Sequence, residues 1–151
     1  MSCDNVTLQP ATPADAEKIL WLEEVCMKDL ATALWGNWRA SDTVATLDIS
    51  HHEMVAVDGK SVGCIATRRE TDGWRLLKLY LAPEARNQGI GAIVLGQVIV
   101  RAAKLPLRLR VLVNNPAVRF YNRHGFRMEL KTDEHVYMIR DADHSVRGAQ
   151  T

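Results

Sequence analysis

Residues 77–103 read LKLYLAPEARNQGIGAIVLGQVIVRAA, and this stretch decides the fold. Leucine alternates with other side chains over the first five residues, which predicts a β-strand. Pro83 ends this strand, because proline cannot donate to a sheet ladder. A polar loop with two glycines follows, and the apolar run over residues 88–104 predicts a long helix. Strand, loop and helix in this order are typical of an α/β protein.

The loop has the composition of an anion-binding site. It consists of Arg86, Asn87, Gln88, Gly89, Ile90, Gly91 and Ala92. Glycine lets the backbone approach a ligand closely, and the first turn of a helix leaves four N–H groups without intrahelical partners. With the Arg86 guanidinium and the helix dipole, these groups suit a phosphate or pyrophosphate. A strand-to-helix turn that binds nothing is the alternative interpretation.

Two other phosphate-binding patterns do not match. The dinucleotide pattern G-x-G-x-x-G fails because Val94 stands where its third glycine belongs. The P-loop pattern fails because no Gly-Lys-Ser/Thr follows.

A second motif lies at residues 114–126, after another predicted strand, and reads NNPAVRFYNRHGF. With both motifs present, the sequence resembles the GCN5-related N-acetyltransferase (GNAT) family. The family's phosphate loop, Arg/Gln-x-x-Gly-x-Gly/Ala, is matched by Arg86, Gly89 and Gly91. Its later signature, Asn-x-x-Ala-x-x-x-Tyr-x-x-x-Gly-Phe, is matched by Asn114, Ala117, Tyr121, Gly125 and Phe126. The resemblance covers roughly residues 6–140 and is specific from about residue 76 to residue 126.

The resemblance implies an α/β fold with a mixed central sheet of about six to seven strands. The sheet would begin with an antiparallel meander and carry about four helices on its faces. Residues 77–81 and 107–113 would form a splayed pair of parallel strands, joined by a right-handed crossover. We expect a single domain over residues 1–151, with a core at about 6–140 and a polar tail at 141–151.

The resemblance also implies an activity. Members transfer the acetyl group of acetyl-CoA to a primary amine of a small molecule or a protein, by direct attack on the thioester. Backbone groups of Leu79 and Leu81 would pair with the pantetheine arm, and an N–H near Leu81 would face the thioester oxygen. The loop, residues 86–92, would hold the pyrophosphate, and Asn114 would also bind coenzyme A. Tyr121 would protonate the departing thiolate, with a purely structural core tyrosine as the alternative.

The general base cannot be carried over from the family. Many members place a glutamate early in the strand before the loop, but residues 74–78 read WRLLK. Carboxylates elsewhere, or a chain of waters, remain as candidates: Glu70, Asp72, Glu23 and Glu24. This departure keeps a second function open, a non-catalytic module that binds or senses acyl-CoA. A dinucleotide-binding domain is a more distant alternative.

The acceptor side is expected around the first helix. Thr12 and Pro13 predict its start, and the WGNW stretch at residues 35–38 predicts its end. The two tryptophans there would either seal the core or wall the acceptor pocket. A second short helix is expected at residues 41–47.

The strand before the loop is expected to have two different faces. Leu77, Leu79 and Leu81 should point to the core under the long helix. Lys78 and Tyr80 should point toward the first helix, where Lys78 either pairs with a carboxylate or receives an anionic acceptor.

Composition excludes several classes of partner. The net charge of +1 provides no field that would favour nucleic acid or an anionic membrane. The three cysteines are far apart, and His51 and His52 are adjacent, so neither a metal site nor a disulfide framework is indicated. No signal-peptide pattern or apolar run of about 18 residues is present, so a cytoplasmic protein is expected. The sequence does not identify the acceptor amine, and it leaves open whether the protein forms the homodimer common in the family.

Overall fold

The computed structural model describes residues 5–142. Seven strands form one sheet in the order β1-β2-β3-β4-β5-β7-β6. They are β1 (Val6–Pro10), β2 (His52–Val57), β3 (Lys60–Arg69), β4 (Trp74–Leu81), β5 (Leu107–Leu112), β6 (Arg127–Lys131) and β7 (His135–Arg140). The β4–β5 pair is parallel and the other neighbours are antiparallel, so the predicted mixed sheet with its antiparallel meander is confirmed.

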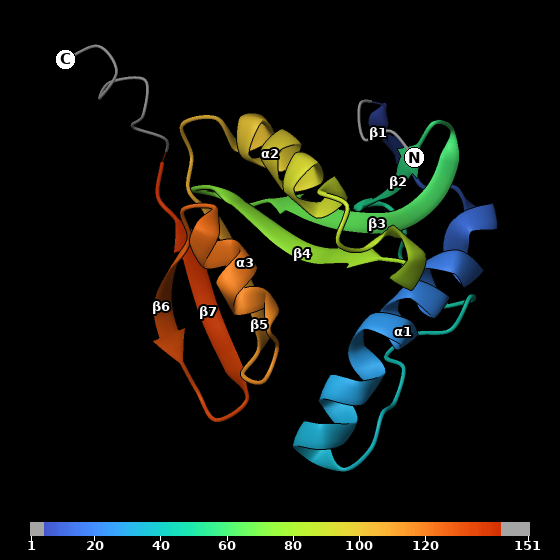
Figure 1. Cartoon of the computed structure of the whole chain (residues 1–151), viewed down its shortest axis with the longest axis horizontal. Coiled ribbons are helices and arrows are strands. Elements are labelled where there is room, and N and C mark those ends of the chain that lie inside the picture. The colour runs from blue at the N-terminus through green and yellow to red at the C-terminus, as the bar shows by residue number, and fades with distance from the viewer. Residues whose placement is uncertain (1–4, 143–151) are drawn as a thin grey trace.

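Three α-helices cover the two faces of the sheet (Figure 1). They are α1 (Ala16–Trp35), α2 (Ile90–Ala102) and α3 (Ala117–Arg123). One apolar cluster, which includes Leu95 of α2 and Tyr121 of α3, fills the face under those two helices. A smaller cluster, with Ile19 and Leu22 at its centre, lies under α1 on the opposite face. The protein is therefore a three-layer α/β/α structure.

The first helix begins and ends as its sequence predicts. The backbone N–H of Thr12 donates to the Asp15 carboxylate over 2.8 Å, and a 3₁₀ turn from Pro13 leads into α1. At the other end Gly36 has φ 85°, a left-handed conformation that costs glycine little, and its N–H donates to the Thr32 carbonyl.

The prediction of a short helix at residues 41–47 is wrong. Only an isolated turn forms there, in which the Leu47 N–H donates to the Thr43 carbonyl. The Thr46 hydroxyl accepts from the Thr43 N–H and donates to Asp42, so local side-chain bonds replace the helical pattern. The described residues contain three α-helices, close to the expected number of about four.

The prediction that Leu77 of β4 points to the core is wrong. Ala66 pairs with Lys78 and Thr67 pairs with Leu76, so Leu77 is the extra residue of a β-bulge. Leu77 is 38% exposed, and Leu76 takes the buried position instead. Leu79 and Leu81 pack against the core as expected.

No helix among the described residues is long and apolar enough to cross a membrane. From residue 143 onward, the expected polar tail lies outside the described residues.

Candidate functional site

The site is organised by the way in which β4 and β5 separate. The two strands pair only at Trp74–Leu107 and Arg75–Arg108, and beyond these pairs they turn away from each other (Figure 1). We call the unpaired part, residues 76–81 of β4 and 109–112 of β5, the splay. β4 lies in the middle of the sheet, but the backbone groups of residues 76–81 that face β5 form no hydrogen bonds with it.

Hydrogen bonding to β3 shows which backbone groups of β4 face the splay. The Ala82 N–H donates to the Val62 carbonyl of β3 over 2.8 Å. In an antiparallel ladder alternate residues direct their N–H and C=O groups toward and away from one neighbour. Leu81 and Leu79 therefore direct theirs away from β3 and into the splay. An extended ligand with amide groups can add here as a further strand does.

The loop before α2 curls so that its backbone N–H groups lie at the start of the helix. Asn87 has φ 62° and Gly89 has φ 82°, both in the left-handed region. The Ile93 N–H donates to the Gly89 carbonyl over 3.2 Å and closes the first turn. The N–H groups of the preceding residues, 89–92, are those without an intrahelical acceptor. This arrangement can bind a phosphate group.

Gly91 brings the loop against both β4 and α3. A methyl group at this position would lie 3.6 Å from the Phe120 ring and 3.8 Å from the Leu81 side chain. The loop, the end of the splay and the helix that carries Tyr121 are therefore neighbours in space.

Arg86 makes contacts that its motif did not predict. Its Nε donates to the Leu81 carbonyl over 3.2 Å, and its guanidinium also contacts Cys26 Sγ at 3.3 Å. Cys26, half-buried on α1, itself donates to the Leu81 carbonyl at 3.5 Å. Burial raises the pKa of this thiol, and the nearby guanidinium opposes the increase. Cys26 thus lies at the site, although in sequence it shows only the helical spacing of a core residue.

Tyr121 is buried in the core under α2 and α3, with its ring edge-on to Phe120 and Phe126. Burial raises the pKa of Tyr121, so its hydroxyl stays protonated at neutral pH. Burial also raises the pKa of Tyr80, which lies on the α1 face, and the Glu23 carboxylate adds to that increase.

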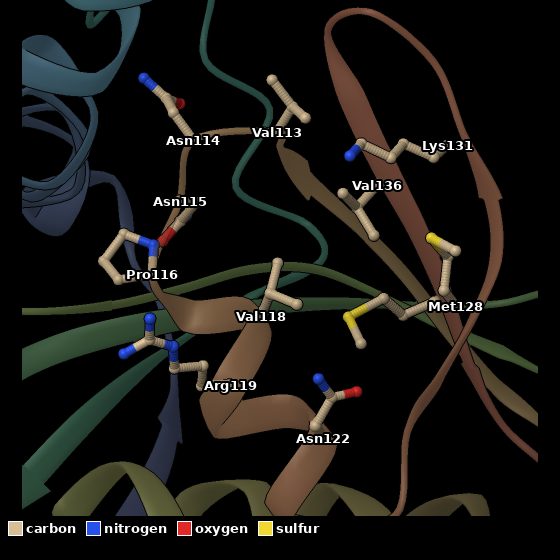
Figure 2. Close-up of a pocket in the computed structure, with 11 residues that line it drawn as sticks. Val113, Asn114, Asn115, Pro116, Val118, Arg119, Asn122, Met128, Lys131 and Val136 are labelled. Atoms are coloured by element: carbon tan, nitrogen blue, oxygen red, sulfur yellow. The ribbon is translucent and has the colours of Figure 1, made fainter.

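Asn114 follows the end of β5, and its amide is used within the protein. Its Nδ2 donates to the Leu30 carbonyl of α1 over 3.0 Å. Asn114 also lines a cavity of about 610 Å³ between α3 and the β6–β7 hairpin, into which Val118, Val136 and Met128 point (Figure 2). None of the loop residues 86–92 lines this cavity, so it touches the candidate site only at Asn114.

The residues expected on the acceptor side do face α1. Lys78 forms an ion pair with Glu23 of α1 at 3.4 Å, and both side chains are mostly buried. Of the two alternatives for Lys78, the structure therefore has the carboxylate partner. Tyr80 packs against the cluster under α1. Trp35 does not seal the core: it is 47% exposed, and its Nε1 donates to Glu134 over 2.7 Å.

Carboxylates suggested as the general base hold cations instead. Glu70 binds Arg75 at 3.0 Å and Arg68 at 3.1 Å, and these bonds lower its pKa. Asp72 lies 3.5 Å from Arg108. Glu23 is likewise paired with Lys78. Of the four carboxylates suggested as the general base, Glu24 is therefore the one that forms no ion pair with the described residues.

Comparisons of the sequence and of the fold with known proteins point to the same family. A model of the acetyltransferase (GNAT) domain matches residues 49–128, which include the loop and Tyr121. No curated protein sequence matches the chain.

Three solved structures illustrate the similarity of fold. The PaiA N-acetyltransferase of Thermoplasma acidophilum, in complex with coenzyme A, has a TM-score of 0.70 and 20% identity over 93% of this chain and 99% of its own. Ard1 of Thermoplasma volcanium has a TM-score of 0.68 and 18% identity over 91% and 98%. The ribosomal-protein-S18-alanine N-acetyltransferase of Escherichia coli has a TM-score of 0.67 and 17% identity over 91% and 96%.

Proposed function

We propose, because this chain belongs to the acetyltransferase (GNAT) family, that it is an N-acetyltransferase that uses acetyl-CoA as its donor and a primary amine as its acceptor. The acceptor amine belongs to a small molecule or a protein. The observation that carries the proposal is the splay, where backbone groups of Leu79 and Leu81 are left without a strand partner beside the first turn of α2.

Coenzyme A suits this place for two reasons. Its pyrophosphate matches the N–H groups of residues 89–92 and the positive end of the α2 dipole. Its pantetheine arm contains amides that can pair with Leu79 and Leu81 as a strand would. The coenzyme A complex of the T. acidophilum protein, which has the same fold, supports this placement.

Binding of the arm requires a change at Arg86. The guanidinium lies on the Leu81 carbonyl, one of the groups that the arm would use. We expect the arm to displace it, so that Arg86 can turn toward the pyrophosphate, where a guanidinium binds phosphate oxygens in pairs.

The reaction needs three events at the splay. The neutral amine attacks the thioester carbon, a C–N bond forms, and negative charge develops on the thioester oxygen. The N–H of Leu81, or of the deeper Leu79, stabilises this charge, a contact typically worth about 10²–10³ in rate. The C–S bond then breaks, and Tyr121 gives its proton to the thiolate. The acylated nitrogen loses one proton to solvent, and solvent returns one to Tyr121, so that the products are the amide and the free thiol. Its raised pKa keeps that proton available at neutral pH.

Calorimetric titration tests the donor site. We expect saturable binding of acetyl-CoA by the wild type, none of NAD, and loss of acetyl-CoA binding in Gly89→Glu, whose carboxylate would repel the pyrophosphate. Ligand at about 100 times its dissociation constant should also add about 2.7 kcal/mol of thermal stability. A folded wild type that binds no acetyl-CoA would contradict the proposal.

A second function remains because Glu70 and Glu23, two of the carboxylates suggested as the general base, are each held by a cation. A non-catalytic acyl-CoA-binding module would bind acetyl-CoA equally well. Release of coenzyme A in the presence of amines distinguishes the two, because only the transferase releases it.

A further inference from the structure

The sheet face opposite α2 and α3 carries a row of cations close to the splay. These cations are Arg68, Arg75, Lys78, Arg108 and Arg110. Side chains alternate between the two faces of a strand, and the neighbouring residues Thr67, Trp74 and Leu109 contact α2 or pack in the core under it. Four of these cations have carboxylate partners within 3.5 Å: Arg68 and Arg75 with Glu70, Lys78 with Glu23, and Arg108 with Asp72 and Glu129.

Arg110 is the exception in this row. It is exposed, and within residues 5–142 its guanidinium has no hydrogen bond or ion pair. Across the β5–β7 pair it stands opposite Tyr137, whose ring is 6.0 Å from that of His135. Burial and then the Arg110 guanidinium lower the pKa of His135, so the three side chains share one small area.

Arg110 also has a defined position relative to the splay. Arg108 is the last residue of β5 that pairs with β4, so Arg110 is on the unpaired part. Asn114 follows the end of β5, and its bond to the Leu30 carbonyl joins that end of the strand to α1. The bond between Trp35 and Glu134 ties the end of α1 to the β6–β7 hairpin. Arg110 therefore stands on the unpaired part of β5, close to the place where α1 is joined to β5 and to the β6–β7 hairpin.

We infer that Arg110 binds a carboxylate of the acceptor, so that the acceptor is an amine that also carries a carboxylate. The inference rests on the proposed N-acetyltransferase function. A guanidinium can hold a carboxylate through two parallel hydrogen bonds, and here no group of the described chain does so.

The inference concerns the charge at the far end of the acceptor and not its length, because β4 and β5 share no register beyond Arg75 and Arg108. 5-Aminopentanoate, with four methylene groups between its amine and its carboxylate, is a flexible probe of such an acceptor.

The test compares three amines of similar length: 5-aminopentanoate, pentylamine and 1,5-diaminopentane, whose far ends are anionic, neutral and cationic. Coenzyme A release gives kcat and KM for each. We expect kcat/KM to be about tenfold or more higher for 5-aminopentanoate, since a hydrogen-bonded charge pair commonly contributes this much. Arg110→Gln should abolish the preference mainly through KM, and Arg110→Lys should keep part of it. Lys60→Gln, which removes the same charge from the distant β2–β3 hairpin, should change nothing.

Each other outcome contradicts the inference. Preference for pentylamine or diaminopentane excludes a carboxylate site, and so does a preference that survives Arg110→Gln. If acetyl-CoA binds but none of the three amines is acetylated, the inference fails while the donor site stands. If acetyl-CoA does not bind, the proposed function itself fails.

Discussion

His52 should make this protein lose stability at mildly acidic pH. It is the first residue of β2 and is only 7% exposed. Both of its ring nitrogens are buried without a hydrogen-bond partner, which is true of no other buried side-chain polar atom among the described residues. Burial and then the Lys78 ammonium lower the pKa of His52 to about 4, against the opposing effect of Asp48.

The sign and size follow from proton linkage. The unfolded chain takes up a proton at His52 near the ordinary pKa of about 6.5, whereas the folded chain does so only near 4. Between these values the unfolded state binds more protons, so stability falls as the pH falls. From about pH 7.5 to about pH 4.5 the loss due to His52 alone is about 2.5 kcal/mol. That corresponds to about 5–10 °C in melting temperature for a chain of this size.

Urea unfolding of the wild type and of His52→Leu at both pH values measures this loss. Other groups also titrate, but they do so in both proteins, and the difference between the two pH dependences isolates His52. His52→Leu should also be at least as stable as the wild type at pH 7.5, because it removes two unsatisfied buried nitrogens. Equal pH dependence of the two proteins would refute the reasoning, because it would mean that folding does not lower the pKa of His52.

Three further predictions concern the site. Tyr121→Phe should lower kcat by about 10² or more and leave acetyl-CoA affinity unchanged; unchanged turnover would remove Tyr121 from the mechanism. Gly89→Ala should destabilise the fold by about 1–2 kcal/mol and weaken acetyl-CoA binding, because Gly89 has φ 82°. Its control, Gly96→Ala, places a methyl group in equally open space on α2 and should stabilise by about 1 kcal/mol; equal effects would exclude strain. Lys78→Met should cost about 3 kcal/mol by leaving Glu23 unpaired, and adding Glu23→Leu should restore most of it in urea unfolding. A single variant as stable as the double variant would contradict this.

Local patterns in the sequence determine most of the fold. Alternation predicts the strand at residues 77–81, which the structure contains as the second part of β4, Trp74–Leu81. Proline, glycine and capping residues act within a few positions of themselves, so the start of α1 at Thr12–Pro13 and its end at Gly36 are also readable. The loop and the residues around Tyr121 are recognisable because each is a contiguous motif.

Contacts between distant segments decide what the sequence predicts wrongly or not at all. The bulge that exposes Leu77 depends on the register between β3 and β4, which no property of residues 77–81 reveals. The contact of Arg86 with Cys26 joins residues 60 positions apart, and the bond of Trp35 to Glu134 joins residues 99 positions apart.

The same distinction applies to the charges of the site. A sequence shows that Lys78 and Arg110 are cations, but only packing shows that Lys78 meets Glu23 while Arg110 meets no carboxylate of the described chain. Whether a charge is compensated depends on which side chains folding brings within a few ångströms, and that distance is a property of the tertiary structure. The sequence thus determined the family, the central strand and the glycine loop, and the tertiary structure decided which polar groups are paired within the described chain.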